Sequence, residues 1–124
     1  MLGDYPIDVV LLAPDLEASA DFYATKLGLK IINKSPDAVT FKCGGDSHLA
    51  VKSTVGTKDE QTQAAFRVRD VRTEVAELRR RSVKIEDYDL PGLKTVDGIA
   101  DIGFAWMAWF IDPGKNCVGI IQIK

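Results

Sequence analysis

Six residues are the candidates for doing chemistry or for holding a small molecule: Asp8, His48, Gln63, Arg67, Met107 and Trp109. Carboxylate, imidazole, amide and guanidinium groups can orient a polar ligand, because each forms directional or charge-assisted hydrogen bonds. Thioether and indole groups are apolar and polarizable, and they suit the wall of a site for a flat molecule. The strands that carry these residues decide which of them can meet.

His48 is the only histidine of the chain. Strand alternation places residues 48 and 50 on the same face, so His48 could serve as a general base or a displaced metal ligand. The other interpretation, which we favour, is a partly exposed strand residue that follows a turn. Cys43 and Cys117 are interpreted as small hydrophobic residues, because nothing near either one signals a lowered thiol pKa.

Asp8 and Arg67 have two interpretations. They could form a charged clamp for a polar ligand, or each could be a rim charge or part of a structural ion pair. Met107 and Trp109 likewise either pack in the core or form an apolar wall, which Tyr88 and Phe104 could close from a long loop. The sequence leaves both choices open.

The composition excludes several classes of function. The chain has 124 residues, 46% of them hydrophobic, and a formal net charge of −2, which is typical of one globular domain. Its arginines between positions 67 and 81 alternate with acidic residues and predict a solvated helix face, so we expect no nucleic-acid partner. The absence of a long apolar run and of a disulfide framework predicts a cytoplasmic protein with no membrane partner.

The order of local signals occurs twice along the chain. In the first half, an apolar strand is expected at 7–13 and a helix at 15–27. Asp15 is the N-cap of this helix, and Gly28 is its left-handed C-terminal cap. Three strands follow, at 29–32, 39–43 and 48–51. In the second half, a strand at 64–69 precedes Asp70, a helix at 70–81, and Ser82 in place of the glycine. A strand at 83–85, a long loop at 89–103, and strands at 106–111 and 117–123 complete it.

This repetition predicts an α+β fold of two βαβββ modules. Two such modules side by side would form a curved eight-stranded mixed sheet with the helices on the outer face and a cavity on the concave face. We expect one domain over 1–124, with module one at about 5–53 and module two at about 62–124. The alternative is a generic α+β domain whose halves are alike by chance.

Three segments carry a family resemblance. Residues 15–23, 65–71 and 108–116, the last reading Ala-Trp-Phe-Ile-Asp-Pro-Gly-Lys-Asn, resemble the two first-helix signatures and the late turn of the vicinal-oxygen-chelate superfamily. This group includes glyoxalases, bleomycin-resistance proteins and extradiol dioxygenases. Residues 89–98 are also similar to loops of glyoxalase-like proteins.

The resemblance implies four positions for metal ligands: Asp8, Ala50, Gln63 and Gly119. Ala50 and Gly119 have no donor atom in their side chains, and Gln63 is a neutral, weak ligand. A catalytic divalent metal needs about three protein ligands and one open position. The sequence therefore predicts no bound metal and no cofactor, although a weakly held divalent ion at Asp8 and Gln63 is an alternative.

Three functions are compatible with these features. The one that we favour is a metal-free small-molecule binding protein that resembles bleomycin-resistance proteins and sequesters a flat or drug-like organic ligand. The second is a lyase, isomerase or oxygenase that uses a divalent metal held by Asp8 and Gln63, or Asp8 as a base. The third is a non-catalytic partner domain with a vestigial cavity. In each case we expect a homodimer, because small two-module members often pair.

Overall fold

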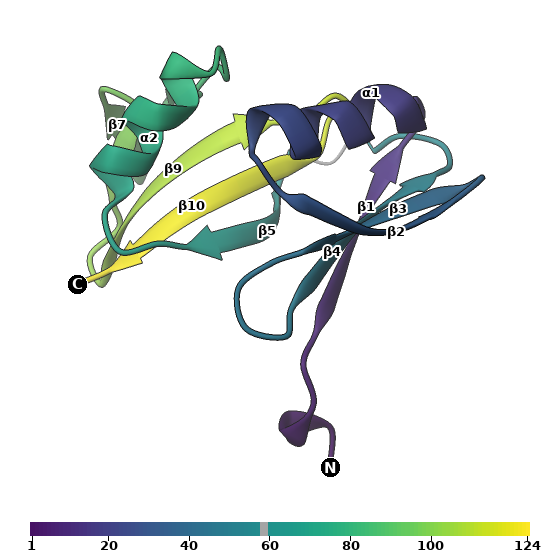
Figure 1. Cartoon of the computed structure of the whole chain (residues 1–124). Helices are drawn as coiled ribbons and strands as arrows, with labels where there is room; N and C mark the ends of the chain where they lie inside the picture. The colour runs from purple at the N-terminus through teal and green to yellow at the C-terminus, as the bar shows by residue number, and fades with distance from the viewer. Residues whose placement is uncertain (58–59) are drawn as a thin grey trace. The chain divides into compact units, whose positions relative to one another are not determined.

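The computed structural model describes residues 1–57 and 60–124, which form two compact units (Figure 1). Unit 1 contains residues 1–57 together with 113–115, and unit 2 contains residues 60–112 together with 116–124. Each unit has its own sheet and its own α-helix. Among the described residues, no helix is long and apolar enough to cross a lipid bilayer.

Unit 1 has a four-stranded sheet with the strand order β1-β4-β3-β2. β1 pairs with β4 in parallel, and the other two pairs are antiparallel. The elements of this unit are η1 (Leu2–Asp4), β1 (Asp8–Ala13), α1 (Leu16–Asp21), η2 (Phe22–Lys26), β2 (Lys30–Ser35), β3 (Ala38–Lys42) and β4 (His48–Ser53).

Local chemistry sets the ends of the helical segment in unit 1. The Asp15 carboxylate accepts a hydrogen bond from the Ala18 N–H at 3.0 Å and so caps α1. α1 then continues into η2, a π-helical turn in which the Leu27 N–H donates to the Phe22 carbonyl, five residues earlier. Gly28 follows with a φ of +71°, as expected for a left-handed cap.

The core of unit 1 lies between its helix and one face of its sheet. Leu11, Phe41 and Val51 are fully buried and lie on the face of their strands that alternates with the more exposed one. The Phe41 ring packs on the buried Tyr23 ring of the helix, with the centroids 6.0 Å apart. The apolar spacing in the sequence predicts that the helix buries one stripe made of Leu16, Ala20, Tyr23 and Leu27, and this prediction is partly wrong. Tyr23 is buried, but Leu16 and Ala20 are only partly covered, because the helix is turned so that Ser19 faces the core.

Unit 2 has a six-stranded sheet with the order β5-β10-β9-β8-β7-β6. β5 pairs with β10 in parallel, and the remaining neighbours are antiparallel. α2 packs on the two longest strands, β9 and β10 (Figure 1). The elements are β5 (Thr62–Arg67), α2 (Val71–Arg80), β6 (Asp89–Leu90), β7 (Leu93–Val96), β8 (Ile99–Asp101), β9 (Ala105–Ile111) and β10 (Cys117–Ile123).

The second helix is held by two side chains. The Asp70 carboxylate accepts from the N–H groups of Arg72 and Thr73, and Gln122 accepts from the N–H of Val71 at 2.9 Å. Ser82 ends this helix with a φ of +65°, close to that of Gly28 at the end of the first. The two modules therefore share their helix caps, with an aspartate at the start and a residue of positive φ after the end.

The expected α+β fold of two similar modules is confirmed, with three corrections. The strands form two sheets of four and six strands instead of one eight-stranded sheet. Residues 83–85 form no strand although Val83 and Ile85 are buried, because the Val83 N–H donates to the Leu78 carbonyl of α2 instead of to a neighbouring strand. The expected loop at 89–103 contains three strands, β6 to β8, which extend the sheet of unit 2 beyond β9.

Candidate ligand-binding site

Trp109 is the centre of an apolar cluster in unit 2. Its indole is 6% exposed, and its Nε1–H donates to the Thr62 hydroxyl at 3.0 Å. The buried members of this cluster are Trp109, Ala100 and Cys117, and partly buried side chains surround them: Tyr88, Leu93, Ile102, Met107 and Ile111. Trp109 is thus buried and packs against the partly exposed residues around it. Those residues form the apolar surface that a ligand can reach.

Tyr88 lies in the segment just before β6 and packs against Trp109. Its ring meets the Trp109 ring edge to face, with the centroids 5.5 Å apart and the planes at 89°. Burial, followed by the charge of and hydrogen bond to the Cys117 side chain, raises the pKa of Tyr88 to about 12. The phenol is therefore neutral at physiological pH.

The alternation of β9 and β10 separates this cluster from the helix. Gln122 binds the first turn of α2 and pairs across the ladder with Trp106, so Trp106 lies on the helix side. Met107 and Trp109 therefore lie on the opposite side. Phe104 does not close the cluster, because its side chain is 64% exposed.

Met107 fills the space beside Gly119, the position where the resemblance implies the third metal ligand. A Cβ at Gly119 would lie 2.5 Å from Met107 Cε and 3.4 Å from both Ala65 Cβ and Thr62 Cγ2. Real Cβ atoms essentially never approach other atoms as closely as 2.5 Å. A donor side chain at position 119 is thus absent, and a methyl group occupies the place where it would begin.

Gln63 is engaged with the backbone of the same unit. Its Oε1 accepts a hydrogen bond from the Cys117 N–H at 2.9 Å, at a bulge where the register of β5 against β10 shifts. The side chain therefore takes the place of a missing ladder bond. Arg67, four residues further along β5, is exposed.

Asp8, His48 and Ala50 share the face of the unit 1 sheet that lies opposite its core. Asp8 pairs with His48 in the register of β1 and β4, and Ala50 lies two residues further along β4. The Asp8 Oδ1 and His48 Nδ1 atoms are 3.8 Å apart, which is an ion-pair distance and too long for a hydrogen bond. The alternation expected for residues 48 and 50 is thus present, and the His48 side chain is 38% exposed.

Residues 7–115 match the family described as Glyoxalase/Bleomycin resistance protein/Dioxygenase superfamily. The chain belongs to this superfamily. A search of curated proteins found no match. The superfamily assignment confirms the resemblance inferred from the motifs at 15–23, 65–71 and 108–116.

Solved structures of superfamily proteins share the fold. A glyoxalase/bleomycin resistance protein/dioxygenase from Alicyclobacillus acidocaldarius is 21% identical with a TM-score of 0.69, covering 97% of this chain and 92% of its own. TnmS3, an antibiotic binding protein from Streptomyces sp. CB03234, is 21% identical with a TM-score of 0.65, covering 96% and 93%. A lactoylglutathione lyase from Agrobacterium tumefaciens is 22% identical with a TM-score of 0.64, covering 94% and 91%.

The residues of this superfamily member do not fit a catalytic divalent metal. Unit 1 offers Asp8 and His48, whereas unit 2 offers an amide oxygen already bonded to the backbone and a glycine. Within residues 1–57 and 60–124, no group of three or more His, Cys, Asp or Glu side chains lies together as a metal site would require. Burial also raises the pKa of the Cys43 thiol, which makes that group a poor nucleophile or ligand.

The structure adds Thr62 and Cys117 to the residues identified from the sequence. Thr62 binds the indole of Trp109, and Cys117 contacts both Gln63 and Tyr88. No motif marks either residue. Only the register of β5 against β10, in which Thr62 faces Cys117, brings them to the cluster.

Proposed function

We propose that this protein binds a small organic molecule without a resident metal, in the manner suggested by the bleomycin-resistance branch of its superfamily. The observation that carries the proposal is Met107, whose methyl group fills the space at Gly119 where a ligand-bearing side chain would start. An apolar thioether at that point replaces a metal-binding surface by a ligand-packing surface. The antibiotic binding described for TnmS3, a protein of the same fold, is compatible with this function.

The unit 2 cluster suggests the chemistry of the ligand. Its accessible side chains, Tyr88, Leu93, Ile102 and Met107, are apolar or aromatic and only partly buried. A flat, largely apolar molecule would gain most from such a surface, at roughly 25 cal/mol per Å² of apolar area removed from water. The Tyr88 phenol, which already hydrogen-bonds with the Cys117 side chain, would accept one hydrogen bond from a donor on that molecule. Gln63 and Arg67 are the polar candidates on β5 that the sequence indicates.

On the sheet of unit 1, taken by itself, Asp8 and His48 are candidates for polar contacts with a small molecule. Their 3.8 Å separation leaves both groups able to turn toward a ligand, because no short hydrogen bond holds them together. An Asp8→Asn variant tests this role without removing volume.

We also propose a homodimer in the cytoplasm. Light scattering that gives twice the chain mass of 13.6 kDa would support the dimer, and a single chain at micromolar concentration would refute it.

Fluorescence of Trp109 offers a direct test. The Trp106→Phe variant leaves Trp109 as the only tryptophan, so quenching or a spectral shift on addition of bleomycin, acridine or quinoline reports on the unit 2 cluster. Met107→Ala should weaken binding about tenfold, which corresponds to about 1.4 kcal/mol. Leu90→Ala, an exposed residue outside the cluster, is the matched control and should leave binding unchanged.

Elemental analysis of the protein purified without chelator separates binding from metal-dependent catalysis. Binding of a flat organic probe with less than about a tenth of an equivalent of metal supports the proposal. About one equivalent of metal per chain, lost in Asp8→Ala, would overturn it and favour the enzyme. A protein that binds neither probes nor metal would overturn both.

A further inference from the structure

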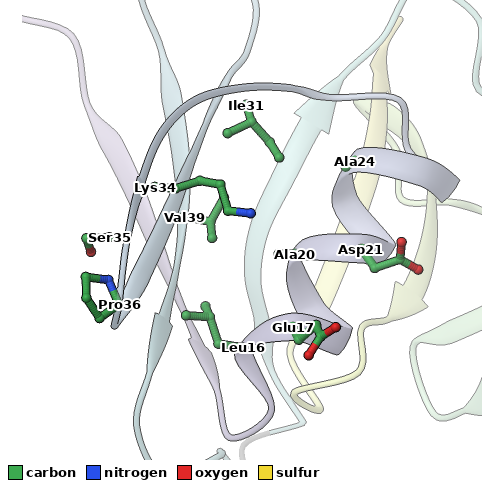
Figure 2. A pocket seen from close by; sticks show the side chains of 10 residues that line it. All are labelled: Leu16, Glu17, Ala20, Asp21, Ala24, Ile31, Lys34, Ser35, Pro36 and Val39. Atoms are coloured by element: carbon green, nitrogen blue, oxygen red, sulfur yellow. The ribbon is translucent and has the colours of Figure 1, made fainter.

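Unit 1 has a groove of its own between the helix and the β2–β3 hairpin. It has a volume of about 520 Å³. Ten residues line it: Leu16, Glu17, Ala20, Asp21, Ala24, Ile31, Lys34, Ser35, Pro36 and Val39. Figure 2 shows Leu16, Ile31 and Val39 extending into the space between the helix and the strands, which gives the groove an apolar floor. The groove lies on the helix side of the sheet, opposite the face that carries Asp8 and His48.

Charges of opposite sign stand on its two walls. Lys34 reaches from β2 toward the helix, and Glu17 and Asp21 follow one another along the helix, one turn apart (Figure 2). Within the described residues, none of the three forms an ion pair. Asp21 accepts one hydrogen bond, from the Thr25 hydroxyl at 3.1 Å. The walls therefore offer one positive and two negative groups on either side of apolar surface.

The helix is irregular where it borders the groove. Ala24, a lining residue, belongs to the π-helical segment Phe22–Lys26. π-helical turns are rare, and they occur mostly at functional sites because their geometry is less favourable than that of an α-helix. Ala20 and Ala24 have short side chains that do not fill the space between the helix and the hairpin, so the groove stays open there.

We propose that this groove binds a zwitterionic molecule the size of a short peptide, with an apolar body between an ammonium and a carboxylate group. The ammonium group pairs with Glu17 and Asp21, the carboxylate pairs with Lys34, and the body covers Leu16, Ile31 and Val39. The volume of about 520 Å³ lies within the usual range for small-molecule sites. This site is separate from the unit 2 cluster and does not depend on the function proposed for it.

The dipeptide leucyl-leucine is a suitable probe, because its two charges can be removed one at a time. Its N-acetylated form lacks the ammonium group, and its C-amidated form lacks the carboxylate. NMR titration of the labelled protein should shift the resonances of Ala20, Ala24 and Ile31, with a dissociation constant on the order of a millimolar. Each of the two modified forms should bind about two- to fivefold more weakly, since exposed ion pairs are individually weak.

Charge-neutral variants assign each end of the probe. In Lys34→Gln, the C-amidated and free forms should bind equally, and in the double variant Glu17→Gln with Asp21→Asn the N-acetylated and free forms should bind equally. Lys30→Gln, an exposed lysine on the same strand that does not line the groove, is the control and should preserve both differences.

Three outcomes would overturn the proposal. The first is an absence of shifts at the groove. The second is equal binding of the free, acetylated and amidated peptides to the natural chain. The third is a set of shifts confined to Tyr88, Met107 and their neighbours, which would assign the peptide to the unit 2 cluster. Failure of the flat probes at Trp109 would leave this site unaffected.

Discussion

Substitution of Gly119 by alanine tests directly whether Met107 occupies the position of the lost metal ligand. The new Cβ would lie 2.5 Å from Met107 Cε, so the thioether must move. Overpacking of this kind costs about 1–3 kcal/mol, and the flexible end of a methionine places the cost near the lower limit. Replacement of a strand glycine by alanine recovers about 0.5–1 kcal/mol. We expect Gly119→Ala to lower the free energy of unfolding by no more than about 0.5 kcal/mol.

The Met107→Ala background should reverse the sign of this effect. With the thioether removed, the nearest side-chain neighbours of the new Cβ are Ala65 Cβ and Thr62 Cγ2, each at 3.4 Å. That is ordinary van der Waals contact, so Gly119→Ala should then stabilise the protein by about 0.5–1 kcal/mol. The coupling between the two positions is thus about 1 kcal/mol, which is within the usual range for residues in contact.

Urea unfolding of the two single variants and the double variant measures this coupling, with far-UV circular dichroism as the signal. Val96→Ala, at an exposed strand position, is a control that should show no coupling to Gly119→Ala. If Gly119→Ala has the same effect with methionine and with alanine at position 107, the thioether does not fill the site. The main structural support for a metal-free function would then be lost.

Three further predictions concern caps and titration. Ser82→Gly should stabilise the protein by about 0.5–1 kcal/mol in thermal unfolding, because Ser82 has a φ of +65° and glycine bears no Cβ there; no change or a loss would refute this. An ultraviolet titration should show one of the three tyrosines ionising near pH 12, and Tyr88→Phe should remove it. Because the folded pKa is the higher one, the contribution of Tyr88 to stability is complete below about pH 10 and falls as the pH rises to 12. Glu77→Gln should lower the urea midpoint at pH 7 and have no effect near pH 2, since hydrogen bonds from Arg80 and Arg81 lower the pKa of Glu77 to about 2; equal effects at both pH values would contradict this.

The helices and their caps could be predicted because their signals are local. Asp15, Asp70 and Gly28 act through hydrogen bonds and backbone angles within a few residues, and each has the expected role. Strands β7 and β8 could have been predicted as well, since Asp97-Gly98 between them is a hairpin turn signal with positive φ at both residues. The absence of a strand at 83–85 could not, because burial against the helix and pairing in a sheet favour the same apolar residues.

The candidate site was less accessible to sequence reasoning. Period-two alternation correctly gives the shared face of His48 and Ala50. The bond from the Cys117 N–H to Gln63 depends on a register shift between strands 54 residues apart in sequence. The groove beside Lys34 depends on the rotation of the helix, which the apolar spacing of Leu16 and Ala20 does not determine.

The edge strand β2 also affects how this protein behaves at high concentration. All six of its residues are exposed, including Ile31 and Ile32 at 38% and 44%, so it could act as a template for intermolecular strand pairing. Lys30 and Lys34 flank the two isoleucines, and the pairing register shifts between Ile31 and Asn33, which twists the edge away from a flat partner. These lysines therefore act as gatekeepers against aggregation. A variant that neutralised both would expose the strand to fibril-like stacking while leaving the folded unit intact.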